Sequence, residues 1–137
     1  CFNTLRTVIP AMKNQGFSKI ITFSSLNSVI GVEKETAYAI AKAGVLHLTR
    51  CLAKQLRKDG INVNCIIPGP VKTGRFMSTL KERNKHDLEQ INSTEKLDRI
   101  ANPDDISPVV EFLLSDASDF ISGEVIRVDG GLYPQPM

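Results

Sequence analysis

The sequence has only three cysteines, Cys1, Cys51 and Cys65, an odd and widely spaced set. Because no Cys-x-x-Cys pair occurs, neither a zinc site nor a redox motif is indicated, and we expect no metal ion. Cys51 lies in a helical pattern and Cys65 in an apolar run, where each is expected to be a small buried side chain. This cysteine usage fits a reducing compartment, so we expect a cytoplasmic protein.

An excess of charge of one sign is also missing, since 17 Lys and Arg are balanced by 15 Asp and Glu. The basic residues are scattered, and the pattern therefore indicates neither a nucleic-acid partner nor an anionic membrane surface. No apolar stretch approaches the roughly 20 residues that a transmembrane helix needs. With 137 residues, 42% of them hydrophobic, the chain has the size and composition of at most one ordinary globular domain.

Apolar runs and helical patterns alternate along the chain. Helices are expected near 2–14, from about 37 to 58, and from the strong start signal Asn102-Pro103-Asp104-Asp105 onward. Strands are expected at 19–24, 61–67 and 124–128, where β-branched residues are frequent. The polar stretch 73–100 is too long for an idle connection and predicts one or two short helices that move.

The predicted helices carry apolar stripes at helical spacing. In the long helix the stripe is Val45, Leu48, Leu52 and Leu56. In the last helix it consists of Ile106, Val109, Val110, Leu113 and Leu114. The stripe of the last helix is expected to face a core.

Strands separated by helices imply right-handed crossovers, and hence an α/β fold with a parallel sheet. In such sheets ligands bind beyond the carboxyl ends of the strands. Three special sites follow strand ends directly: Ser25, Pro68-Gly69 and Gly130-Gly131. The order of elements therefore gathers them at one edge of the sheet.

Tyr38 and Lys42 are four residues apart in the predicted long helix, so they share a face. A free tyrosine has a pKa of about 10, and its use as a base near pH 7 requires about 4 kcal/mol of stabilisation. One cation about 4 Å away supplies roughly that much at an effective dielectric of about 20. Alone, the spacing fits equally well an aromatic–cation pair on a helix surface.

Ser25 stands thirteen residues before Tyr38 and could hydrogen-bond a substrate oxygen. It could also be a helix-capping or turn serine, and Ser24 and Ser28 are alternatives to it. The run from Pro68 to Thr73 is either a plain strand terminator or a bend. In the second case the Val71 N–H and the Thr73 hydroxyl would face a ligand amide.

In combination these residues resemble the classical short-chain dehydrogenase/reductase family, and most of all its 3-oxoacyl-[acyl-carrier-protein] reductase-like branch. The resemblance extends over essentially the whole chain. It rests on Ser25, Tyr38-Ala39-Ile40-Ala41-Lys42, Asn62-Val63-Asn64 before Pro68-Gly69, Thr73, Arg99-Ile100 before Pro103-Asp104-Asp105-Ile106, and Gly123 through Asp129-Gly130-Gly131.

The resemblance implies an oxidoreductase that uses NAD or NADP on a small-molecule carbonyl/alcohol pair. It implies Tyr38 as general acid/base, Lys42 as the residue that activates the tyrosine and binds the nicotinamide ribose, and Ser25 as the group that polarises the carbonyl. Pro68, Gly69, Val71 and Thr73 would form the nicotinamide end of the cofactor site. Residues 74–97 would form a substrate lid, and a homodimer or homotetramer is implied for the complete protein.

Three features of the family are missing from the sequence: a glycine-rich pyrophosphate loop, an acidic or basic residue that selects NAD or NADP, and an Asn-Ala-Gly stretch after the fourth strand. The catalytic asparagine of the family would fall before Cys1. We therefore expect residues 1–137 to be the C-terminal part of a Rossmann-type doubly wound domain, with three remaining parallel strands and flanking helices. The alternative is a non-catalytic fragment that serves as an interaction module of the same fold.

Overall fold

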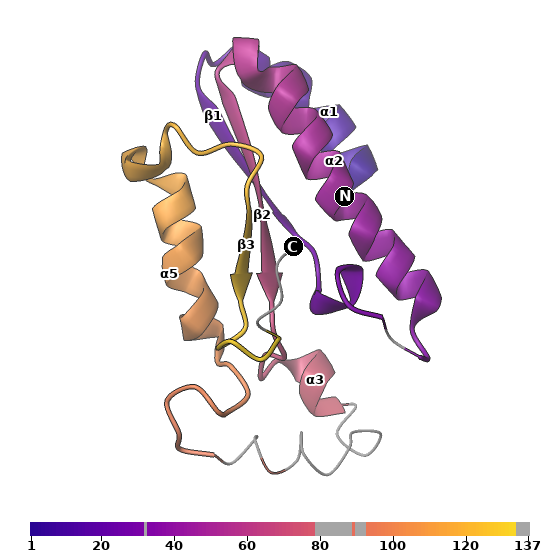
Figure 1. Cartoon of the computed structure of the whole chain (residues 1–137). Coiled ribbons are helices and arrows are strands. Elements are labelled where there is room, and N and C mark those ends of the chain that lie inside the picture. Colours follow the sequence, from indigo (N-terminus) through magenta and orange to yellow (C-terminus); the bar gives the residue numbers. More distant parts are fainter. Residues whose placement is uncertain (32, 79–88, 90–92, 134–137) are drawn as a thin grey trace.

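Seven helices and strands follow one another in a computed structural model, which describes residues 1–31, 33–78, 89 and 93–133 (Figure 1). They are α1 (Phe2–Lys13), β1 (Ser18–Phe23), α2 (Thr36–Leu56), β2 (Ile61–Pro68), α3 (Gly74–Ser78), α5 (Pro103–Leu114) and β3 (Val125–Val128). Short 3-10 helices follow three of them, at Leu26–Ser28, Arg57–Asp59 and Asp116–Ser118.

The three strands form one parallel sheet in the order β1-β2-β3. Figure 1 shows α1 and α2 on one face of this sheet and α5 on the other. The chain therefore has the predicted α/β architecture, with helices on both faces of a parallel sheet and the elements in the expected order. The predicted helices and strands are confirmed to within two residues at their ends.

The central strand β2 carries the core because helices cover it on both faces. Five residues of β2 are at most 1% exposed. One face of the strand carries Ile61, Val63, Cys65 and Ile67, and the opposite face carries Ile66. Ile61 and Val63 pack with α1 and α2, whereas Ile66 packs with Ile106 and Leu113 of α5. This division follows the period of two in a strand.

Asn62 and Asn64 of β2 attach the turn after α5 to the sheet. The Asn62 amide donates to the carbonyls of Ser118 and Asp119, at 3.3 and 2.8 Å. Asn64, which is 2% exposed, donates to the Ile121 carbonyl at 2.8 Å and accepts from the Glu124 N–H at 3.1 Å. The two amides are thus paired with backbone groups of this turn, as polar groups in and near a core usually are.

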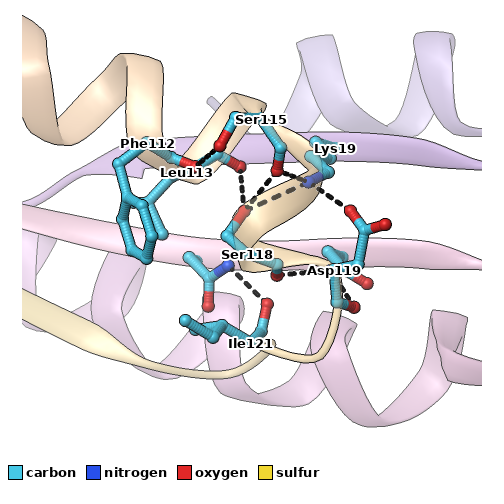
Figure 2. Close-up of polar contacts among 9 residues, drawn as sticks. Lys19, Phe112, Leu113, Ser115, Ser118, Asp119 and Ile121 are labelled. Atoms are coloured by element: carbon cyan, nitrogen blue, oxygen red, sulfur yellow. Dashed lines mark hydrogen bonds and ion pairs between the residues drawn. The ribbon is translucent and has the colours of Figure 1, made fainter.

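Lys19 of β1 holds the same turn from the other side, as Figure 2 shows. Its side chain is only 7% exposed, and its Nζ lies 2.7 Å from Asp119 Oδ1 and 3.1 Å from Ser118 Oγ. It also donates to the Ser115 carbonyl. The ammonium is therefore fully partnered on the edge of the sheet opposite to the strands' carboxyl ends.

The helix faces differ in part from the predicted stripes. In α2 the buried residues are Leu46, Thr49, Ala53 and Leu56, while Val45, Leu48 and Leu52 are half-buried. Thr49 is buried because its hydroxyl contacts Thr22 Oγ1 at 2.6 Å and donates to the Val45 carbonyl at 2.9 Å.

Two further residues were predicted to face the core but do not. Leu114 is 53% exposed, because its place at the end of the α5 stripe turns it away from the sheet. Cys51 is also exposed, since it lies on the outer face of α2, whereas Cys65 is buried as expected.

The turn before β2 requires a glycine at Gly60. This residue has φ +70°, and a Cβ built on it would lie 2.2 Å from the carbonyl oxygen of Gly16. The close approach joins the turns that lead into β1 and β2, and the Ser18 N–H donates to the Gly60 carbonyl at 3.1 Å. Among the described residues, no helix is long and apolar enough to cross a membrane.

Candidate active site

Ser25 lies just beyond the carboxyl end of β1, within a cluster of three serine hydroxyls. Ser24 is buried, and its hydroxyl donates to the Lys42 carbonyl at 2.8 Å. The Ser28 hydroxyl donates to the Ser25 carbonyl at 2.6 Å. Both alternatives to Ser25 therefore have a bond for their single proton: Ser24 joins the loop to α2, and Ser28 closes a turn within the loop.

The Ser25 hydroxyl is placed differently from its two neighbours. It accepts a hydrogen bond from the Asn27 N–H at 3.3 Å, and so it caps the short helix Leu26–Ser28. Within the described part of the chain it donates to no protein group. A hydroxyl that accepts from the backbone and keeps its own proton can still donate to an incoming oxygen.

Tyr38 and Lys42 lie one turn apart on α2, and both are near the Ser25 loop. The Lys42 Nζ donates to the carbonyl of Phe23, the last residue of β1, at 3.0 Å. It lies 5.8 Å from the centre of the Tyr38 ring. Tyr38 is 40% exposed, which leaves its ring open to a ligand. Ser25, Tyr38 and Lys42 are thus gathered at the carboxyl end of β1.

The loop before α2 sets the position of its first turn. The Asn27 amide donates to the carboxylate of Glu35, the residue that precedes the helix. The Glu35 carbonyl accepts from the Ala39 N–H at 2.8 Å. The loop that carries Ser25 is therefore joined directly to the turn that carries Tyr38.

The second group of predicted residues follows the carboxyl end of β2. Gly69 continues the ladder through its N–H, 2.9 Å from the Val128 carbonyl. A Cβ on Gly69 would lie 3.1 Å from both Cα and Cβ of Asp129, so glycine permits the close approach of β3. Pro68 ends β2 opposite Val128.

The bend continues into a second short parallel contact. Val71 pairs with Ala101. The Ala101 N–H donates to the Pro70 carbonyl at 3.0 Å, and the Lys72 N–H donates to the Ala101 carbonyl at 2.8 Å. Thr73 directly precedes α3: its N–H donates to the Val71 carbonyl at 2.7 Å, and its hydroxyl accepts from the Phe76 N–H at 3.4 Å. Like the Ser25 hydroxyl, the Thr73 hydroxyl donates to no other group among the residues that the structure describes.

Parallel register relates the two groups. Phe23 is paired with Ile66, and the Ser24 N–H donates to the Ile66 carbonyl at 2.9 Å. Ser25 and Pro68 therefore leave neighbouring strands at about the same level.

A cavity of about 420 Å³ opens beside the bend, at the ends of β2 and β3. Its walls include Gly69, Pro70 and the turn from Asp129 to Leu132, together with residues 96–101. Tyr38 does not line it. Of the predicted lid, Gly74–Ser78 forms α3, and 79–88 and 90–92 lie outside the described residues.

Arg99 and Asp105 were matched to the family pattern but given no role by sequence reasoning. They form a two-pronged ion pair, in which Arg99 Nη1 and Nη2 each lie 2.7 Å from one Asp105 carboxylate oxygen. These bonds from Arg99, followed by one from the Asn102 N–H, lower the pKa of Asp105 from 3.8 to about 2. The sequence shows Asp105 as an acidic residue in the first turn of a helix. It does not show that Arg99, in the preceding loop, is its partner.

Comparison with known proteins identifies the family. Residues 1–133 match the family model described as Enoyl-(Acyl carrier protein) reductase. The chain belongs to the short-chain dehydrogenase/reductase family. Its relatives in this family are oxidoreductases. It is 34% identical over 131 residues to 3-oxoacyl-[acyl-carrier-protein] reductase FabG of Thermotoga maritima, covering 96% of this chain and 52% of that protein.

Solved structures of the same family have the same fold. A 7α-hydroxysteroid dehydrogenase in complex with NADH matches 95% of this chain and 50% of its own, with 31% identity and a TM-score of 0.84. A gluconate 5-dehydrogenase from Burkholderia cenocepacia, in complex with NADP, matches 98% and 52%, with 28% identity and a TM-score of 0.85. The chain therefore spans about half the length of the relatives it matches.

Proposed function

We propose that this chain supplies the proton-transfer groups and the nicotinamide end of the cofactor site in an NAD(P)-dependent oxidoreductase that interconverts a carbonyl and an alcohol. Its main support is the gathering of Ser25, Tyr38 and Lys42 at the carboxyl end of β1, within a chain of this family. We further propose that the active protein is a longer polypeptide, which also contains the segment that binds the rest of the dinucleotide.

Tyr38 is the proposed general acid/base. In the direction of reduction its phenol gives a proton to the carbonyl oxygen, and in oxidation the phenolate takes the proton of the alcohol. Lys42 lies one turn further along the same helix, with Nζ 5.8 Å from the centre of the Tyr38 ring. Ser25 donates its unused proton to the same substrate oxygen and holds it near Tyr38.

The donor set fits the nicotinamide end of NAD(P). When bound, the nicotinamide supplies a hydride to the carbonyl carbon or accepts one from the alcohol carbon. Lys42 would hold the adjacent ribose through its ammonium. The bend from Pro68 and Gly69 to Val71 and Thr73 would hold the carboxamide, where the free Thr73 proton supplies one donor.

The substrate is proposed to be a small carbonyl compound or the matching alcohol. Residues 74–97 would cover it, and α3 places the buried Phe76 at the start of this segment. The names of the relatives refer to a 3-oxoacyl-[acyl-carrier-protein], a hydroxysteroid and gluconate, so this one fold serves substrates of different classes.

We propose a homodimer or homotetramer for the longer polypeptide. Its support is an apolar groove of about 310 Å³ along α1 and α2, which includes the half-buried Ile9, Leu48 and Leu52. Phe2 stands 61% exposed at one end of this groove. A cytoplasmic location is proposed as well, in keeping with three unpaired cysteines.

The test uses the two tyrosines of the chain as a matched pair. In the longer polypeptide, Tyr38→Phe should lower kcat by about 10²- to 10⁴-fold, the usual contribution of a general acid/base. Tyr133→Phe, which removes the hydroxyl of the other exposed tyrosine, should leave kcat unchanged. A 3-oxoacyl thioester and a cyclic ketone serve as probe substrates. Equal turnover in the two variants would overturn the proposed role of Tyr38.

A further inference from the structure

The ion pair between Arg99 and Asp105 encloses a short segment that ends at the first turn of α5. Its two N···O distances are both 2.7 Å, the short length of charge-assisted hydrogen bonds. Asp105 Oδ2 also accepts from the Asn102 N–H at 2.7 Å, and Arg99 Nη1 lies 3.3 Å from the Ile100 carbonyl. The chain from 99 to 105 is therefore fixed by four bonds that converge on two side chains.

Ala101, in the middle of this segment, is the residue that pairs with the bend after β2. Its N–H donates to the Pro70 carbonyl at 3.0 Å and its carbonyl accepts from the Lys72 N–H at 2.8 Å. Val71 lies between these two bonds. Any shift of Ala101 therefore moves the backbone on both sides of Val71, and Thr73 follows through its 2.7 Å bond to the Val71 carbonyl.

The neighbouring side chain reinforces this connection. Ile100 is 1% exposed, so the segment is held on its inner side by packing. On its outer side the ion pair and the Asn102 N–H bond to Asp105 hold it, and the side chains of Arg99 and Asp105 are 22% and 34% exposed. Ion pairs with this much solvent access contribute little to global stability. The two-pronged geometry instead limits the orientation of the segment.

We infer that Arg99 and Asp105 are positioning residues, which hold the Val71–Thr73 bend in the orientation that contacts the nicotinamide carboxamide. This inference rests on the proposed function, because it concerns the same cofactor site. Neither residue is required to touch the cofactor. Their action is transmitted through the backbone of Ala101 and its two hydrogen bonds.

The test compares dissociation constants for two cofactors, measured with the longer polypeptide. The first is the preferred nicotinamide dinucleotide, and the second is its thionicotinamide analogue, in which sulfur, a much weaker acceptor, replaces the amide oxygen that the bend would contact. In the unaltered protein the natural cofactor should bind more tightly. Asp105→Asn should weaken its binding about five- to ten-fold, the value of one lost hydrogen bond, and leave binding of the analogue nearly unchanged.

Two further variants separate positioning from folding. Arg99→Lys keeps the positive charge but loses the two-pronged donor geometry of the guanidinium. Like Asp105→Asn, it should reduce the preference for the carboxamide cofactor over the analogue. Asp104→Asn is the matched control, because Asp104 is exposed in the same first turn of α5 and should leave both dissociation constants unchanged. Hydrogen exchange at the Lys72 and Ala101 amides should accelerate in Arg99→Lys and Asp105→Asn, and not in Asp104→Asn.

The outcomes distinguish this inference from the proposed function. If Tyr38→Phe abolishes turnover while both Arg99→Lys and Asp105→Asn keep the full preference for the carboxamide, positioning by the ion pair is wrong and the proposed function stands. If both variants weaken the two cofactors equally, the pair supports folding only and the inference fails. Full turnover in Tyr38→Phe would overturn the proposed function and, with it, this inference.

Discussion

Replacement of Lys19 by methionine is expected to destabilise the fold far more than the same change at Lys13. The Lys19 side chain is 7% exposed, and its ammonium contacts Asp119 Oδ1, Ser118 Oγ and the Ser115 carbonyl (Figure 2). Lys13 also forms an ion pair, at 2.8 Å with Asp59, but there the side chains are 43% and 30% exposed. The two substitutions therefore remove the same group from different environments.

The size of the Lys19 effect depends on the three oxygen atoms that lose the ammonium as a hydrogen-bond partner. Hydrogen bonds to charged groups are worth about 1.5–3 kcal/mol, and removal of one member of a buried pair costs about 3–5 kcal/mol. Asp119 is 50% exposed, so water recovers part of its interaction, and methionine keeps most of the buried stem. We therefore expect Lys19→Met to lower the free energy of unfolding by about 2–3 kcal/mol, against about 0–1 kcal/mol for Lys13→Met.

Urea-induced unfolding of the longer polypeptide measures both values. The midpoint should fall in Lys19→Met with an unchanged m-value, which shows that stability and not the denatured state has changed. High salt should remove the small Lys13 effect and leave most of the Lys19 effect, because buried charges are weakly screened. Equal losses at the two lysines would refute this account of the turn after α5.

Three other outcomes are expected. Gly60→Ala should cost more stability than Gly16→Ala, since both residues have positive φ but only the Cβ at Gly60 meets a backbone atom, at 2.2 Å; equal unfolding midpoints would contradict this. The carboxyl of Asp105 has its pKa lowered from 3.8 to about 2, so its stabilising effect is present above about pH 4 and is lost as the pH falls toward 2. Between about pH 4 and pH 2 the free energy of unfolding of Asp105→Asn should therefore fall less than that of the unaltered protein. Identical pH dependence of the two proteins would exclude this effect. Residues 1–137 alone should bind NAD(P) weakly, because helix N-termini and backbone amides around the pyrophosphate supply much of a dinucleotide's affinity; micromolar binding by calorimetry would prove this wrong.

Much of the fold could be predicted because β2 and its neighbours follow simple periodic rules. The run INVNCII is covered on both faces, and its alternating residues reach two separate parts of the core. The faces of the helices were harder. A wide apolar stripe does not show which of its members turns outward, so Leu114 was misplaced, and Thr49 was not expected in the core.

The candidate site was predictable where its residues are close in sequence. Ser25, Tyr38 and Lys42 lie within one strand–helix unit, so the sequence could nominate them together, although their roles came from the family resemblance and not from the spacing alone. The alternatives Ser24 and Ser28 could be separated from Ser25 only by their partners, because the use of each proton depends on tertiary contacts. The pairing of Ala101 with the bend after β2 joins distant parts of the chain, and no sequence pattern indicates it.

The most direct test of the central claim is a single-turnover measurement on Tyr38→Phe. The longer polypeptide is first saturated with reduced cofactor and then mixed with a probe carbonyl, while the nicotinamide absorbance is followed. Because the cofactor is already bound, the observed rate reports hydride and proton transfer without cofactor binding. We predict a rate about 10²- to 10⁴-fold below that of Tyr133→Phe, with cofactor binding nearly intact. A rate equal to that of the control would contradict the assignment of Tyr38 as the proton-transfer residue.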